Sequence, residues 1–156
     1  MNKAMPLKAR RKPSLNKPAA KPYVLDEQVG FLLRQVSQRH GVIFAERIGS
    51  NLTPTQWAAL VKLSEAGPCS QNQLGRMTAM DVATIKGVID RLTARGLTET
   101  SADPADGRRL LVTLTRAGQA AVEKTLPLAA DITDETLVPL SAKERETLAA
   151  LLAKLL

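Results

Sequence analysis

The stretch from Ser70 to Gly118 constrains the fold of this chain more than any other part of the sequence. It contains two helix-like segments and then two strand-like segments that are separated by a dense turn. The second helical segment, about Asp81 to Arg95, repeats apolar residues at steps of three and four, which places them on one helix face. We predict that this face is buried; its members are Val82, Ile85, Ile89 and Leu92.

The opposite face of this segment is small and polar, and consists of Ala83, Thr84, Lys86, Gly87, Asp90 and Arg91. A glycine in the middle of a helix costs about 1 kcal/mol relative to alanine. Close packing against another helix would explain Gly87. Close approach of the helix to a ligand surface, such as a DNA groove, would explain it equally well.

The segment before it has the features of a short helix and a turn. Ser70 to Gln73 resembles a capping box, and Leu74 and Met77 then supply an apolar face. Thr78 to Met80 is the predicted turn, and Asp81 suits the N-cap of the next helix. Two short helices joined in this way form a helix-turn-helix, which docks its second helix in the major groove.

A predicted hairpin follows the second helix, which ends at Gly96. Its strands are Leu97 to Ser101 and Leu110 to Leu114, and the turn between them, Asp103 to Gly107, includes the strong hairpin signal Asp-Gly. Arg108-Arg109 stands where the chain leaves the tip. A helix-turn-helix followed by a hairpin with a basic tip is a winged helix.

These segments resemble the MarR family. Residues 106–118 (DGRRLLVTLTRAG) match the family's wing pattern, D-x-R-x-x-x-V-x-L-T-x-x-G, at every fixed position. Residues 52–60 (LTPTQWAAL) are similar to the start of the family's second helix, and Val88 to Leu92 with Gly96-Leu97 to the end of its recognition helix. The likeness covers about Leu25 to Leu156 and implies a mainly α fold, a winged helix-turn-helix with long N- and C-terminal dimerisation helices.

The charge of the chain is unevenly distributed. The net charge is +7, but residues 1–22 hold seven of the 22 basic residues and no acid, so the rest of the chain is neutral overall. These seven are Lys3, Lys8, Arg10, Arg11, Lys12, Lys17 and Lys21. We predict a disordered basic tail at 1–22, which either solubilises the protein or adds non-specific phosphate contacts.

The remainder, 23–156, is expected to be a single MarR-like domain. Its DNA-binding lobe spans about 53–114, and its dimerisation helices span about 25–48 and 115–156. The chain has no apolar run long enough to cross a membrane and no secretory signal, so we expect a cytoplasmic protein. One cysteine and one histidine cannot build a metal cluster, and no cofactor motif or catalytic pair is present, so we expect neither a cofactor nor an enzyme.

The predicted first helix, Leu25 to Ile48, carries an apolar stripe made of Val29, Leu32, Leu33, Val36, Ile43 and Phe44. His40 falls on this stripe and should be at least partly buried. It is either a packed core histidine or part of an effector site, where it would bind a carboxylate or a hydroxyl. The resemblance implies an effector that binds between the dimerisation helices and the DNA-binding lobe; the predicted site is His40, Phe44, Arg47 and Trp57.

Helix signals also mark the other segments of the chain. Thr53-Pro54 predicts a helix start, and Gly67-Pro68 its end. Cys69 follows at the mouth of the next helix, a position that can lower the pKa of a thiol. We nevertheless expect no redox role, because peroxide-sensing relatives place their reactive cysteine in the first helix.

The C-terminal part has two predicted features. Pro127 should kink or split the helix that starts at Thr115. Ser141 to Glu144 reads as a capping box for a last helix, whose leucine stripe runs to the end of the chain (Leu148, Leu151, Leu152, Leu155 and Leu156). A terminal stripe of this length needs a partner. The resemblance implies that the first and last helices pair across a two-fold axis, so we predict a homodimer.

The sequence therefore predicts a transcription regulator that binds double-stranded DNA. The candidate DNA-binding residues are Ser70, Gln71, Ala83, Thr84, Lys86, Gly87, Arg91, Asp106, Arg108 and Arg109. Thymine methyl contacts are assigned to Ala83 and Thr84, phosphate or guanine contacts to Lys86 and Arg91, and a minor-groove contact to Arg108. Asp106 is expected to orient Arg108, and an ion pair within the domain is considered for Asp90 and Arg91.

The resemblance favours a repressor that a small aromatic or heteroaromatic acid releases from its operator, as in relatives that control the degradation of aromatic compounds. Two alternatives stay open. One is a ligand-independent regulator or activator. The other is a protein–protein interaction module that uses the C-terminal leucine-rich helix.

Overall fold

The computed structural model describes residues 22–49 and 52–156, so the basic residues of the tail lie outside the described part. The helices are α1 (Val29–Ile48), α2 (Pro54–Ala66), α3 (Gln71–Met77), α4 (Val82–Ala94), α5 (Arg116–Thr125), α6 (Leu128–Thr136) and α7 (Ala142–Ala153); the strands are β1 (Thr98–Ala102) and β2 (Leu110–Leu114). A 3₁₀ turn, η1 (Leu25–Glu27), precedes α1, so the predicted first helix is interrupted at Gln28. The described chain is mainly helical with one hairpin, as predicted.

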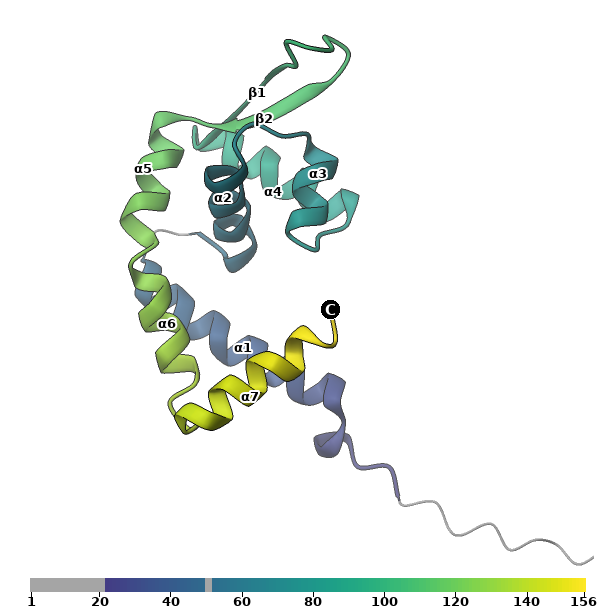
Figure 1. Cartoon of the computed structure of the whole chain (residues 1–156), viewed down its shortest axis with the longest axis vertical. Helices are drawn as coiled ribbons and strands as arrows, with labels where there is room; N and C mark the ends of the chain where they lie inside the picture. The colour runs from purple at the N-terminus through teal and green to yellow at the C-terminus, as the bar shows by residue number, and fades with distance from the viewer. Residues whose placement is uncertain (1–21, 50–51) are drawn as a thin grey trace, which may run out of the picture.

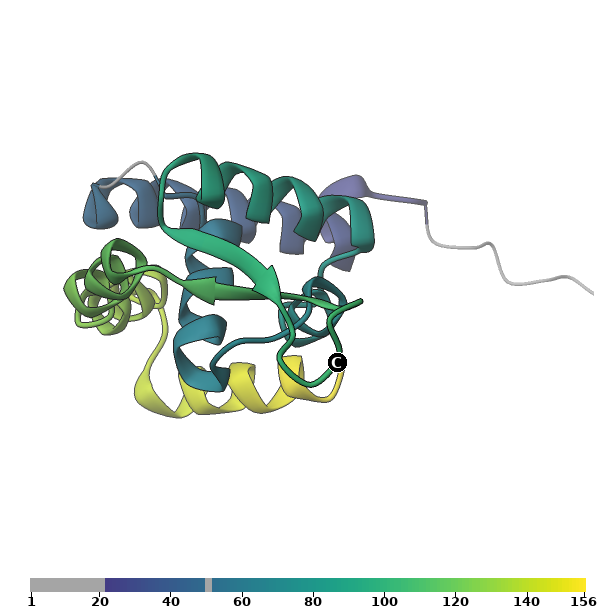
Figure 2. The same cartoon turned by 90° about the horizontal axis from the view of Figure 1, so that it is seen from above.

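The elements form two bodies joined by α5 (Figure 1). The winged lobe comprises α2, α3, α4 and the β1–β2 hairpin, which projects from its outer edge. The terminal-helix layer comprises α1, α6 and α7, with α6 packed on α1. Figure 2 shows α1 and α7 running on opposite sides of the axis that α5 and α6 share. None of the described helices is both long enough and apolar enough to cross a membrane.

The core is mainly aliphatic, and the burial of its residues corrects one prediction about α4. Ile85, Ile89 and Leu92 are buried as predicted, but Val82 is 67% exposed, and Val88 is buried in its place. Asp81 is the N-cap of α4, so Val82 is the first residue of the helix, and the cover that buries Ile85 does not extend to it. The apolar period alone could not show where that cover ends.

Capping side chains fix where the helices begin. Thr53 with Gln56 and Ser141 with Glu144 form complete capping boxes at α2 and α7. Ser70 forms only half of the predicted box: its hydroxyl accepts from the Gln73 amide, and within the described residues the Gln73 side chain makes no reciprocal bond to the Ser70 amide. Proline has the predicted effect at position 127, where the chain divides into α5 and α6.

The wing pattern L-T-x-x-G has a packing reason. Thr115 caps α5: its hydroxyl donates to the Gly96 carbonyl at 2.6 Å and accepts from the Gly118 amide at 3.1 Å. A Cβ at Gly118 would lie 2.0 Å from the Leu97 carbonyl oxygen. Glycine at this position therefore lets α5 meet the backbone that leads from α4 into β1.

The hairpin has the predicted return strand, and its first strand is shifted one residue, to Thr98–Ala102. Thr98 pairs with Leu114 and Ala102 with Leu110 in an antiparallel register. Cys69 joins this sheet through two backbone hydrogen bonds with Val112. Its side chain is 2% exposed, and burial raises the pKa of the thiol, opposite to the lowering that a helix N-terminus would give.

The apolar stripe of the terminal-helix layer is buried at one end only. Ile43 and Phe44 lie in the core, whereas Val29, Leu32, Leu33 and Val36 on α1 are exposed in the isolated chain. Leu151 and Leu152 in the last turn of α7 are exposed as well, and so are Leu155 and Leu156, which lie beyond the end of α7 at Ala153, so the helix stops short of the predicted end of the leucine stripe. Between α1 and α7 lies an apolar groove of about 730 Å³, whose lining includes Val36, Leu140, Leu148 and Leu151.

Candidate DNA-binding surface and effector pocket

The first turn of α4 presents methyl groups to solvent. The Asp81 carboxylate accepts the Thr84 amide at 2.7 Å, which fixes the helix start and holds the pKa of Asp81 below its ordinary value. Val82, Ala83 and Thr84 are all exposed there. Ala83 and Thr84 were predicted to make thymine methyl contacts, whereas Val82 was assigned to the core. Its exposed position adds a third methyl-bearing side chain to this turn.

The surroundings of Gly87 test one of the two explanations offered for it. The three atoms nearest to a Cβ built at Gly87 all belong to the Arg91 guanidinium, at 3.4, 3.9 and 3.9 Å. No other helix approaches that closely, so close helix packing does not account for this glycine. Close packing occurs instead at Gly75 in α3, where a Cβ would lie 3.1 Å from the Met80 carbonyl oxygen and 3.2 Å from Ile85.

The exposed face of α4 carries one ion pair. Asp90 pairs with Lys86 at 2.5 Å, one helical turn away, so the ion pair within the domain that we considered for Asp90 is present. Both partners of the observed pair are more than half exposed, and such a pair contributes little stability. The Arg91 guanidinium has no ion-pair partner among the described residues, so it is the more available cation of the two predicted.

The N-terminal end of α3 lies beside the base of the wing. Ser70 and Gln71, both predicted site residues, share a hollow of about 410 Å³ with Asn72, Arg76 and Arg109. Asn72 and Arg76 were not predicted. Their exposed positions on a short helix could have been recognised, but only the fold shows that they face the wing.

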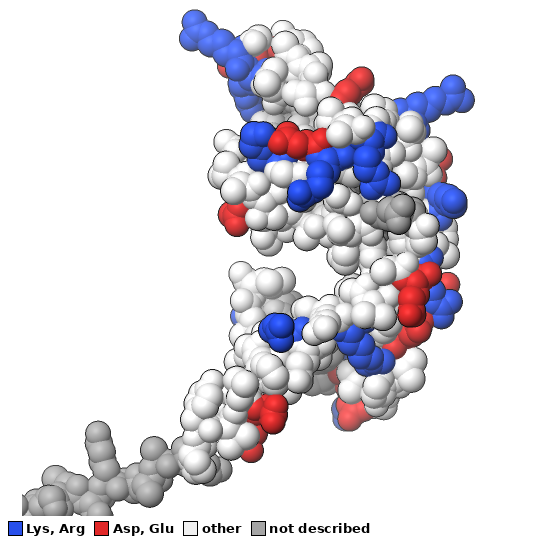
Figure 3. Space-filling view, turned by 180° about the vertical axis from the view of Figure 1, so that it is seen from behind, with Lys and Arg blue, Asp and Glu red and all other residues white. Residues whose placement is uncertain are grey.

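The wing tip is ordered by its aspartates. Asp103 Oδ1 accepts the Ala105 amide at 2.8 Å, and Asp106 Oδ1 accepts the Arg108 amide at 3.1 Å. Asp106 therefore orients the backbone of Arg108; no bond between Asp106 and the guanidinium is present. Arg109 lies 4.0 Å from Asp103, whereas the Arg108 guanidinium has no ionic or hydrogen-bond partner within the described ranges. Figure 3 shows basic side chains in a band across the winged lobe.

A second site lies where the two bodies meet. A pocket of about 330 Å³ is lined from α1 by His40 and Phe44, from α2 by Pro54, Trp57 and Ala58, and from α6 by Ala129, Ile132 and Thr133. The Phe44 and Trp57 rings meet edge to face, with centroids 5.9 Å apart. His40 is half-buried, as predicted. Three of the four predicted effector residues therefore line one pocket.

Arg47, the fourth predicted effector residue, does not line this pocket. Its guanidinium pairs with Glu135 of α6, with Nη2 2.6 Å and Nε 2.7 Å from Oε2, and this carboxylate raises the pKa of Arg47. The pairing holds the side chain against α6. The sequence could not show it, because the two residues are 88 positions apart.

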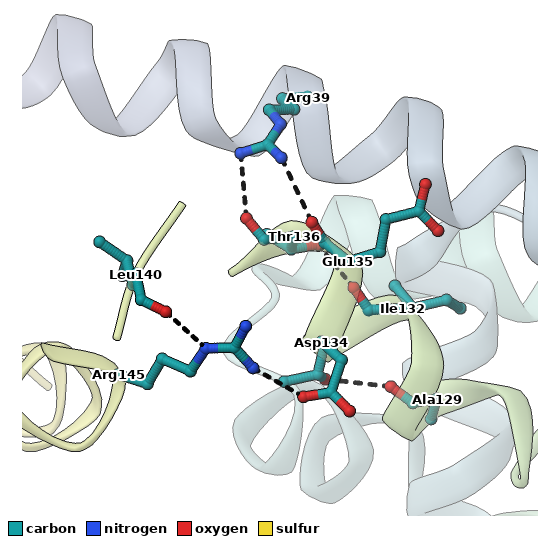
Figure 4. Close-up of polar contacts among 9 residues, drawn as sticks. Arg39, Ala129, Ile132, Asp134, Glu135, Thr136, Leu140 and Arg145 are labelled. Carbon is teal, nitrogen blue, oxygen red and sulfur yellow. Dashed lines mark hydrogen bonds and ion pairs between the residues drawn. The ribbon is translucent and has the colours of Figure 1, made fainter. Parts of the chain in front are cut away.

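Polar contacts also fix α6 against α1 and α7 (Figure 4). Arg39 donates to the backbone carbonyls of Thr136 and Glu135 at 3.0 and 3.2 Å, which satisfies acceptors at the C-terminal end of α6. Arg145 of α7 donates to the Leu140 carbonyl at 3.1 Å and pairs with Asp134 at 2.9 Å. His40 Nδ1 lies 3.0 Å from Thr136 Oγ1.

A helix-turn-helix followed by a hairpin, with exposed basic residues on both, defines a winged helix-turn-helix DNA-binding protein. The MarR family model matches residues 52–110. Over 136 residues, which cover 86% of each protein, the chain is 41% identical to the HTH-type transcriptional repressor NicR of Pseudomonas putida.

Two solved structures are similar over most of the chain. A probable transcriptional regulator from Pseudomonas aeruginosa is 61% identical, with a TM-score of 0.81 over 85% of this chain and 100% of that one. Bordetella bronchiseptica BpsR, whose DNA binding is regulated by 6-hydroxynicotinic acid, is 47% identical, with a TM-score of 0.80 over 86% of this chain and 96% of that one. This chain belongs to the MarR family. It is a DNA-binding transcription regulator that acts as a homodimer, and not an enzyme.

Proposed function

We propose that this protein is a transcriptional repressor that leaves its operator when a small aromatic or heteroaromatic acid binds the pocket between α1, α2 and α6. One observation carries this proposal: the pocket is lined by elements of both bodies. A ligand bound there contacts the winged lobe and the terminal-helix layer at once. It can therefore favour one relative placement of the two bodies over another by its differential affinity.

The lining suits a flat aromatic ligand. Phe44 and Trp57 offer ring surfaces, and Pro54, Ala58, Ala129 and Ile132 add apolar contacts. The similarity to NicR, a repressor, and to BpsR, which responds to 6-hydroxynicotinic acid, supports both the repression and the ligand class.

On the DNA side, we propose that α4 reads the major groove and the wing reaches the adjacent minor groove. Val82, Ala83 and Thr84 contact thymine methyl groups, and Arg91 contacts a phosphate or a guanine. The DNA backbone is contacted by Ser70, Gln71, Lys86 and Arg109. Gly87 allows α4 to approach the DNA closely. Two copies of α4 related by a two-fold axis then read a pseudo-palindrome with half-site centres about 10 base pairs apart or a multiple of that.

The test is a gel shift on the DNA upstream of the protein's own gene, followed by titration of the complex with 6-hydroxynicotinate and 4-hydroxybenzoate. We expect salt-dependent binding to the operator and release by at least one of the two acids. His40→Ala should bind the operator within a few-fold of wild type but need more acid for release. Operator binding that no acid changes would favour the ligand-independent regulator. No DNA binding at all would favour the interaction module.

A further inference from the structure

Two polar side chains of the pocket, Trp57 and Thr133, already donate their hydrogen atoms to hydrogen bonds within the protein. Trp57 Nε1 donates to Thr125 Oγ1 at 2.9 Å, and Thr133 Oγ1 donates to the Ala129 carbonyl at 3.0 Å. An indole nitrogen is a donor only, so Trp57 offers a ligand its ring surface. Thr133 retains only acceptor lone pairs.

The hydrogen bonds of Thr136 show which nitrogen of His40 faces an acceptor. Thr136 Oγ1 donates to the Ile132 carbonyl at 2.7 Å (Figure 4), and a hydroxyl has a single hydrogen. In the 3.0 Å contact with His40 Nδ1, Thr136 must therefore accept. In the neutral form of the imidazole, the one hydrogen consequently lies on Nδ1, and Nε2 is an acceptor. No described residue donates to Nε2.

The described lining carries no full charge that would bind a carboxylate. The two arginines of α1 that contact α6 are engaged elsewhere: Arg39 with backbone carbonyls and Arg47 with Glu135. A carboxylate that entered this lining would lose its hydration without gaining a donor, which is costly. The described side chains therefore offer acceptors and ring surfaces.

We propose that this pocket selects its effector through a hydrogen-bond donor on the ring, a hydroxyl or a ring N–H, which is given to His40 Nε2. Thr136 is the positioning residue, because it holds the imidazole hydrogen on Nδ1. The carboxylate of the acid stays on the solvent side of the pocket. This inference rests on the proposed function, since it assumes an aromatic effector in this pocket.

The test compares acids that differ in the ring donor. Full-length protein is titrated by calorimetry with 4-hydroxybenzoate and its methyl ether 4-methoxybenzoate, and with 6-hydroxynicotinate and nicotinate. Fluorescence of Trp57, the chain's one tryptophan, reports whether each acid enters the pocket. We expect the acid with the ring donor to bind about ten-fold more tightly in at least one pair, which corresponds to one hydrogen bond.

Two variants separate the role of Thr136 from the shape of the pocket. Thr136→Val removes the acceptor, so the imidazole can carry its hydrogen on Nε2. The ratio of the affinities for the acids with and without the ring donor should then fall toward one. Thr136→Ser keeps the hydroxyl and should keep the preference. Melting curves of both variants show whether each is folded, so a change in preference can be compared between folded proteins.

The outcomes distinguish this inference from the proposed function. If acids with and without the donor bind equally well to the wild type and release the operator equally well, the selection rule is wrong and the proposed function stands. If Thr136→Val keeps the full preference, Thr136 does not set it, and the inference is overturned. If none of the four acids binds or releases the operator, both proposals fail together.

Discussion

Two glycines in this chain lie in opposite surroundings. Gly87 lies on the exposed face of α4, where the nearest neighbours of an added Cβ are atoms of the Arg91 side chain. Gly118 lies against the Leu97 carbonyl, which leaves no room for a Cβ. A substitution to alanine therefore tests an external surface at one position and internal packing at the other.

At Gly87, we predict that alanine stabilises the protein and weakens operator binding. The helix gains about 1 kcal/mol because alanine replaces glycine, and Arg91 can move away from the new methyl group. In the proposed complex, the same methyl group would stand between α4 and the DNA. Chemical denaturation and a gel shift on the same sample measure the two effects. Unchanged operator affinity would mean that Gly87 does not face the DNA.

At Gly118, we predict that alanine destabilises the protein by about 3 kcal/mol or more, because α5 must move off the backbone at Leu97. The contacts of Thr115 with Gly96 and Leu97 would be lost in that movement. Gly107→Ala at the wing tip is the matched control, since a Cβ there meets nothing within 4 Å. Thermal unfolding compares the variants, and equal melting temperatures would contradict this account of the wing pattern.

Among the elements, α4 depends on a charged cap. The Asp81 carboxylate accepts the Thr84 amide, and its pKa is lowered for that reason. A lowered folded-state pKa stabilises the protein above the ordinary carboxyl pKa, and this contribution is lost as the pH falls through the lowered value. Asp81→Asn can cap without a charge. We predict that wild type loses stability relative to Asp81→Asn below about pH 4. Urea denaturation at several pH values measures the free energy of unfolding of both proteins. If the two free energies changed with pH in the same way, this prediction would be wrong.

The wing is the second element with a testable role. Arg108→Ala should weaken operator binding by about 1–3 kcal/mol. It should leave the melting temperature nearly unchanged, because in the described structure the guanidinium bonds to nothing within the protein. Lys124→Ala, which removes one charge from the other end of α5, controls for net charge. Equal affinities of wild type and Arg108→Ala would make the wing a structural element only.

The sequence predicted most elements because their boundaries depend on local chemistry. Thr53, Asp81, Thr115 and Ser141 cap helices from within a few residues, and Pro127 breaks one by its own ring. Contacts between distant elements could not be predicted in this way. The burial of Val88 in place of Val82 is one example, and the pairing of Arg47 with Glu135 is another.

The sequence predicted some residues of the candidate site and missed others. His40, Phe44 and Trp57 were placed together because of their helix faces and the family resemblance, and they line one pocket. The hydrogen bonds of His40 and Trp57 within the protein could not be predicted, since their partners, Thr136 and Thr125, come from elements far along the chain. Asn72 and Arg76 were missed because only the folded chain places α3 beside the wing.

At the scale of the whole molecule, we propose that the homodimer buries the exposed apolar residues of α1 and of the C-terminal segment that contains α7. Leu155 is 72% exposed and Val36 55% exposed in the isolated chain, and an apolar groove lies between the two helices. Stable interfaces bury large apolar areas. The space-filling view shows a hollow between the terminal-helix layer and the winged lobe (Figure 3), which leaves room for elements of the second copy.

We predict that Leu151→Glu combined with Leu155→Glu yields a monomer that binds the operator poorly. Two carboxylates on the stripe cannot be buried at an apolar interface without a large cost, and a monomer reads one half-site only. Ala150→Glu, on the opposite face of α7, is the control and should remain a dimer. Light scattering measures the mass, and footprinting shows whether one half-site or two are protected. A double variant that stays dimeric and protects both half-sites would show that the α7 stripe does not hold the two copies together.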